Sequence, residues 1–105
     1  MAWIILVFAG VLEIIWAYSM KVSDGFSKLV PTLLTLIFVV LSFALLSYSM
    51  KTLPLGTAYT IWSGIGVVGS FIVGILVLGE SASFIRILAA LLIVTGLVLM
   101  KISTD

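Results

Sequence analysis

Four long apolar segments, separated by connections of only a few residues, most constrain what this chain can fold into. They cover about residues 2–20, 31–50, 55–79 and 84–100. Each is close to or above the ~20 residues that a helix needs to cross the ~30 Å hydrocarbon core of a bilayer. Backbone polar groups in lipid must be paired within the segment itself, which a helix achieves. The sequence therefore predicts an all-α integral membrane protein with four transmembrane helices in a single domain, residues 1–105.

The composition agrees with a membrane protein and excludes several classes of function. Hydrophobic residues make up 64% of the chain and charged residues 9%, too few to cover a soluble domain. A net charge of +1 gives no basic surface for nucleic acid. The chain has no cysteine or histidine, and it shows no phosphate-binding loop or nucleophile–base pair. We therefore expect no enzyme, no metal site and no cofactor, and a lipid bilayer as the surroundings.

Glu13 is the only acidic or basic residue that lies well inside a hydrophobic segment. At 1.5 Å per residue it lies roughly 3 Å from the midplane of a centred helix. A carboxylate there costs at least a few kcal/mol unless it is protonated or paired. Its neighbours one helical turn away are Ala9, Gly10, Trp16 and Ala17. Three of these are small, and the Trp16 ring can attract a cation. The pattern predicts that Glu13 binds a cation or a proton; the structural alternative is a protonated acid bonded between helices.

Hydroxyl and small residues on the next two segments supply further candidates. Thr35, Ser42 and Ser49 recur every seven residues on one helix face, and Ser42 lies nearest the middle of the membrane. Such hydroxyls either contact a ligand or hold helices together, and both interpretations stay open. The third segment carries a small or polar stripe beside Trp62, made of Tyr59, Ser63, Gly66, Ser70 and Gly74. Glycines at 64, 66 and 69 permit close packing or flexing.

The fourth segment and the distribution of charge bear on assembly. Ala89 and Gly96 lie seven residues apart on one face, a pattern typical of contact between membrane helices. Four helices with one acid are too few to enclose a substrate path, whereas a homodimer supplies two Glu13 side chains to one cavity. Two basic residues on one side of the membrane oppose three on the other. This small bias indicates either one weak orientation preference or insertion in both orientations.

Taken together, these residues resemble the small multidrug resistance family of transporters. The resemblance rests on Gly10-x-x-Glu13, on Pro31 and on the block from Gly56 to Gly66 (GTAYTIWSGIG), and it covers essentially the whole chain. It implies an antiparallel, dual-topology homodimer that exchanges a small organic cation for protons by alternating access. It also implies residue roles. Glu13 would bind substrate or proton. The pocket would be lined by Ser42, Tyr59, Trp62 and Trp16, with Gly10, Thr60 and Ser63 beside them. Flexing would occur at Gly64 and Gly66, and dimer contact at Ala89 and Gly96.

Within that family, Trp16 and Lys101 resemble the guanidinium-exporter subtype. Two positions depart from the usual family pattern, because Thr60 stands where an alanine is usual and Ala89 where a glycine is usual. The leading hypothesis is a guanidinium/proton antiporter in the inner membrane of a bacterium. The first alternative is a multidrug exporter of quaternary ammonium and other hydrophobic cations. The second is a non-transporting protein whose Glu13 pairs with a basic residue of another membrane protein.

Overall fold

The computed structural model describes residues 1–103 and contains four helices within them. They are α1 (Ala2–Val22), α2 (Leu29–Ser49), α3 (Leu55–Leu76) and α4 (Phe84–Ile102). All four are long and apolar enough to cross a membrane. The predicted all-helical fold, with four helices able to span a membrane, is therefore confirmed.

Most helix ends fall within about two residues of the predicted positions, the usual uncertainty of a helix end. The exception is α3, which ends at Leu76 rather than near residue 79, because Gly79 adopts a left-handed conformation (φ +72°) that turns the chain away. Pro31 lies in the first turn of α2, where its missing N–H removes no helical hydrogen bond. The first turn of α4 is capped by Ser83, whose hydroxyl oxygen accepts a hydrogen bond from the Arg86 backbone N–H at 3.3 Å.

A tight turn joins α1 to α2. Ser23 follows the last residue of α1, and its hydroxyl donates to the Met20 carbonyl at 2.7 Å and accepts from the Phe26 N–H at 3.1 Å. Asp24, Gly25 and Phe26 all have positive φ angles, of 52°, 70° and 66°. This left-handed stretch reverses the chain within a few residues, so α2 returns directly alongside α1.

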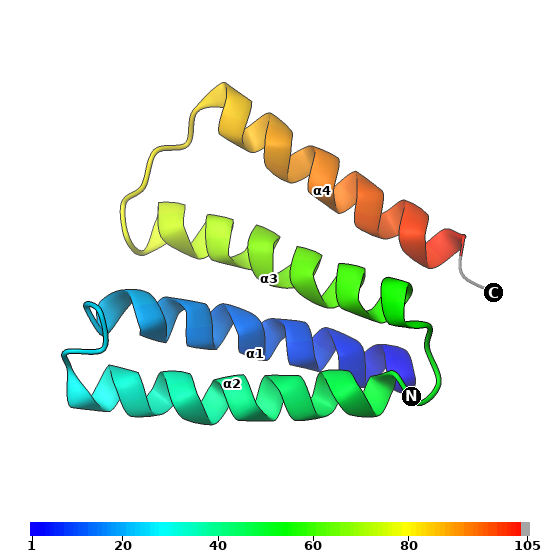
Figure 1. Ribbon diagram of the computed structural model, residues 1–105. Coiled ribbons are helices and arrows are strands. Elements are labelled where there is room, and N and C mark those ends of the chain that lie inside the picture. Colours follow the sequence, from blue (N-terminus) through cyan, green and yellow to red (C-terminus); the bar gives the residue numbers. More distant parts are fainter. Residues whose placement is uncertain (104–105) are drawn as a thin grey trace.

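The helices form a flattened layer in the order α2, α1, α3, α4 (Figure 1), in which α2 also contacts α3. The Cα atoms span 43 × 34 × 16 Å, so the layer is much thinner than it is long or wide. Among the described residues α1 packs against both α2 and α3, whereas α4 packs only against α3. The α1–α2 and α3–α4 connections lie at one end of the layer, and the N-terminus and the α2–α3 connection lie at the other (Figure 1).

The buried core lies where α1 meets α2 and α3. Its largest members are apolar side chains from all three helices: Leu6, Leu46, Ile61 and Trp62. By contrast, α4 has no buried residue. Most large apolar side chains of α2 and α4 point outward, as expected of surfaces that face lipid. The core therefore holds three helices together and positions the middle of α1 against α3.

Candidate functional site

The centre of the candidate site is Glu13, which lies against α3. Its carboxyl group packs directly on the backbone of Gly66, so closely that a Cβ atom at that position would overlap it. One carboxyl oxygen, Oε1, is buried and has no hydrogen-bond partner among the described residues. Because buried polar atoms are normally hydrogen-bonded, this oxygen has an unused capacity to accept. The two residues that sequence patterns singled out on separate helices are in contact.

Ser42 joins the three core helices through its hydroxyl group. It is fully buried, donates to the Ala9 carbonyl of α1 at 2.8 Å and accepts from Nε1 of Trp62 on α3 at 2.9 Å. Its single O–H is therefore committed to α1 in this structure. Of the two interpretations left open, helix bridging is the one that the geometry displays. Contact between Ser42 and a ligand stays a prediction.

Trp62 lies at the centre of an aromatic cluster. Its ring centroid is 5.5 Å from that of Tyr59 and 5.3 Å from that of Phe43, and both pairs are tilted. Such tilted arrangements at this spacing are favourable for aromatic rings. Trp62 is buried whereas Tyr59 is more than half exposed, so the cluster runs from the core to the surface. Phe43 was missed by sequence reasoning, because one more aromatic residue in an apolar segment carries no distinguishing signal.

Trp16 is the second residue with an unpaired polar atom at this site. Its Nε1 is buried and has no hydrogen-bond partner within residues 1–103. The site thus combines an unused acceptor on Glu13 with an unused donor on Trp16, one helical turn apart on α1. A ligand that reaches either of these atoms can gain a hydrogen bond there without first breaking another.

The glycines named from the sequence make close contacts with different helices. A Cβ atom at Gly10 would lie 2.7 Å from the Ile65 side chain of α3, and one at Gly64 would overlap Leu97 of α4. Together with the contact between Gly66 and Glu13, these glycines let α3 approach both of its neighbours. The structure therefore assigns them close packing; flexing at Gly64 and Gly66 stays a prediction. Beside the site, Ser63 is half-buried and Thr60 is exposed.

The predicted dimer-contact residues lie on an open surface. Ala89 and Gly96 are exposed on α4, and a Cβ atom built at Gly96 would have no neighbour within 4 Å. Within the described part of the chain no side chain covers this position. Contact with a second copy through Ala89 and Gly96 stays a prediction.

Known proteins resemble this chain along its whole length. It is 56% identical over 103 residues to a protein named Guanidinium exporter from Salmonella typhimurium, a match that covers 98% of each chain. It is 55% identical over 104 residues to a protein of the same name from Yersinia pseudotuberculosis, covering 99% of this chain and 100% of that one. A third, from Citrobacter freundii, is 51% identical over 104 residues and 99% of each chain.

Residues 1–94 also match the family described as Small Multidrug Resistance protein. This range contains Glu13, Ser42, Tyr59 and Trp62, and it includes all of α1, α2 and α3. With four helices able to span a membrane, the chain is a multi-pass membrane protein that belongs to the small multidrug resistance family of transporters.

Proposed function

We propose that this protein exports guanidinium-type cations in exchange for protons, with Glu13 of two subunits as the shared binding site. The observation that carries the proposal is the Glu13 carboxyl group, which lies against Gly66 in the middle of a membrane-spanning helix with its Oε1 buried and unpaired. The relatives named Guanidinium exporter support the choice of cation. In lipid, such a carboxyl group is stable when it holds either a proton or a cation.

The chemistry of a guanidinium ion suits this site. The ion is planar and remains charged near neutral pH, and its N–H groups form a fork that matches the two oxygens of a carboxylate. Oε1 of Glu13 is free to accept one of these hydrogen bonds. A proton and a cation compete for the same carboxylate, so binding of one releases the other. Competition at one group is sufficient to couple export of the cation to entry of protons.

A homodimer accounts for two features that a single copy leaves open. The helices form a flattened layer and not a closed bundle, because among the described residues α4 packs only against α3, and α4 contributes no buried residue. A second copy packed on the open face of α4, where Ala89 and Gly96 lie, would cover this helix and bring a second Glu13 to the path. Small residues at such positions let membrane helices approach closely. Alternating access would then follow from movement of one copy against the other.

Antiparallel assembly is supported by how basic residues are distributed over the two ends of the layer. Lys21, Lys28 and Arg86 lie at or near the end with the α1–α2 and α3–α4 connections, and Lys51 and Lys101 lie toward the other. Lysine and arginine in loops set the orientation of a membrane protein. Because the two ends differ by only one basic residue, copies can insert into the inner membrane of a bacterium in both orientations and then pair.

The second candidate function is export of quaternary ammonium compounds. The cluster of Phe43, Tyr59 and Trp62 favours it, because ring faces attract cations that have no N–H group to donate. The exposed side of Tyr59 is the part of this cluster that a ligand can reach. The third hypothesis, a non-transporting partner protein, predicts that the purified protein alone moves no cation.

Transport by the purified protein in liposomes separates the three hypotheses. Guanidinium uptake driven by a pH gradient is compared with that of tetramethylammonium and tetrapropylammonium. Glu13→Gln should reduce coupled guanidinium uptake to the level of protein-free liposomes, because a neutral amide cannot exchange a proton for a cation. Asp24→Asn is the matched control, since it neutralises an exposed loop carboxylate whose positive φ angle asparagine also tolerates.

Each outcome supports one hypothesis or contradicts the role of Glu13. Uptake of guanidinium alone, lost in Glu13→Gln and kept in Asp24→Asn, supports the proposal. Equal uptake of the alkylammonium ions supports multidrug export instead. Proton-coupled uptake that persists in Glu13→Gln contradicts the role given to this residue, and the absence of any uptake supports the partner-protein hypothesis.

A further inference from the structure

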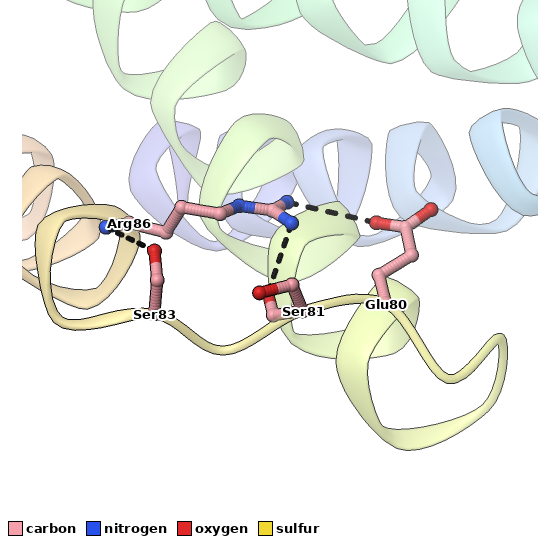
Figure 2. Close-up of polar contacts among 4 residues, drawn as sticks. All are labelled: Glu80, Ser81, Ser83 and Arg86. Carbon is pink, nitrogen blue, oxygen red and sulfur yellow. Dashed lines mark hydrogen bonds and ion pairs between the residues drawn. The ribbon is translucent and has the colours of Figure 1, made fainter.

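A second carboxylate of this protein already holds a guanidinium group, at the end of the layer where α3 connects to α4. The Arg86 side chain places Nη2 3.6 Å from Oε1 of Glu80, and its Nη1 donates to the Ser81 carbonyl at 2.9 Å (Figure 2). The guanidinium carbon also lies 5.1 Å from the centre of the Phe71 ring. A carboxylate, a carbonyl and an aromatic face thus surround the same chemical group that we propose as substrate.

Glu80 is fixed over the last turns of α3. Its backbone N–H donates to the Gly74 carbonyl at 2.9 Å, and its carboxyl group lies so close to Gly74 that a Cβ atom there would overlap it. Only a glycine lets the carboxylate approach the helix this closely. The backbone of Glu80 is therefore fixed on the end of α3, and its carboxylate lies against Gly74.

This group faces a cavity of about 310 Å³ between α1, α3 and the start of α4. Its lining includes Ala17, Lys21, Ser70, Gly74, Glu80 and Arg86. Ala17 and Lys21 lie one and two helical turns beyond Glu13 on α1, and Ser70 and Gly74 lie one and two turns beyond Gly66 on α3. The cavity therefore follows the seam between α1 and α3 from Ile14 and Val67, the residues that follow Glu13 and Gly66 in the chain, to the α3–α4 connection.

We propose that the Glu80 carboxylate, the Phe71 ring and the Ser81 carbonyl form a second cation site, which Arg86 occupies until a free guanidinium-type cation replaces it. The site takes a planar cation with several N–H donors, on its way between Glu13 and the water. This inference rests on the proposed function for the identity of the cation. The binding site itself is defined by the contacts that Arg86 makes.

Exchange between Arg86 and a free cation is feasible because the ion pair is weak. Its side chains are each 41% exposed, its N–O distance of 3.6 Å is longer than a hydrogen bond, and exposed ion pairs contribute little. Arg86 is nevertheless tethered, which gives it an effective concentration on the order of millimolar. Lys21 adds a positive charge to the same cavity. Both effects keep the affinity for a free cation low, as a transit site requires.

The test is a binding measurement that does not involve Glu13. The protein carries Glu13→Gln and is placed in lipid bicelles. Guanidinium chloride is titrated in at constant ionic strength, and the backbone amide NMR signals of residues 80 and 81 are followed. When the protein also carries Arg86→Gln, the half-saturating guanidinium concentration should fall about tenfold, because the tethered competitor is removed. Lys21→Gln should lower it as well, by removal of a like charge. Tetramethylammonium, which donates no hydrogen bond, should bind more weakly.

Glu80→Gln, combined with Arg86→Gln, is the variant that can overturn the proposal. Saturable shifts should disappear in it, because the carboxylate is gone while the loop keeps its length and polarity. Equal shifts with and without the Glu80 carboxylate, or shifts that never saturate when Arg86 is absent, would refute the second site. Since Glu13 is neutral throughout, this failure leaves the proposed function standing. If guanidinium binds at this second site but the unsubstituted protein takes up no guanidinium in liposomes, the proposed function is refuted and the second site is not.

Discussion

The hydroxyl group of Ser42 offers the sharpest test of how the core is held together. Ser42→Ala removes both the bond to the Ala9 carbonyl at 2.8 Å and the bond from Trp62 at 2.9 Å. Hydrogen bonds between membrane helices contribute about 0.6 kcal/mol on average and about 1.7 kcal/mol at most. Two such bonds predict a loss of about 1 to 3 kcal/mol in the free energy of unfolding, part of it from stranding the buried Trp62 N–H.

The free energy of unfolding can be measured by titrating SDS into the protein in mild detergent, with tryptophan fluorescence as the signal. Protein concentration is held constant, because dissociation of the proposed homodimer would otherwise contribute. Ser47→Ala is the matched control, since it makes the same change at an exposed position of α2 and should alter stability by less than about 0.5 kcal/mol.

A double-mutant cycle with Trp62→Phe isolates the bond between Ser42 and Trp62. The cycle cancels what each substitution costs separately and leaves the coupling between them. We expect a coupling of about 0.6 to 1.7 kcal/mol, from the average to the maximum measured for such bonds in membranes. A coupling indistinguishable from zero, or a Ser47→Ala loss equal to that of Ser42→Ala, would refute the assignment of Ser42 as the bridge between helices.

Two further predictions concern glycines. Gly66→Ala forces a methyl group into the Glu13 carboxyl, so it should lower the free energy of unfolding by about 1 to 3 kcal/mol and weaken guanidinium binding. Gly56→Ala, on the same helix but with no neighbour within 4 Å of the added Cβ atom, should change neither quantity. SDS unfolding and isothermal titration measure the two effects, and equal behaviour of the variants would contradict the contact. Gly96→Trp should reduce the fraction of cross-linked dimer in membranes severalfold while circular dichroism stays unchanged. Val94→Trp, an exposed position on the other side of α4, should leave the dimer intact; if both variants dimerise normally, the α4 face is not the contact.

The extent of the helices could be predicted from the sequence because lipid imposes a simple requirement. An apolar run of sufficient length must be helical, so the ranges needed no knowledge of packing. The early end of α3 could not be predicted in this way, since Leu76 and the residues after it are equally apolar. There the left-handed conformation of Gly79 decides where the helix stops, and conformation at a single glycine leaves no trace in hydropathy.

The members of the candidate site could be named from sequence, but not their partners. Glu13 and Gly66 were each distinctive, one as a buried acid and the other as part of a small-residue stripe. Their contact depends on the relative rotation of α1 and α3, which the packing of all three core helices determines. Phe43 and Phe71 gave no signal for a related reason. An aromatic ring among apolar residues becomes meaningful only when the structure shows what lies over its face.

The central position of α1 has a consequence for how the protein is made. Every helix that covers α1 is synthesised after it, and Gly66, on which the Glu13 carboxyl group rests, follows more than fifty residues later. When the synthesis of α1 is complete, the α3 segment that its carboxyl group contacts has not yet been made. The apolar residues of α1 must therefore supply the free energy of membrane insertion by themselves and offset the unfavourable contribution of Glu13. Any substitution that lowers the hydrophobicity of α1 should reduce the yield of inserted protein before it affects transport.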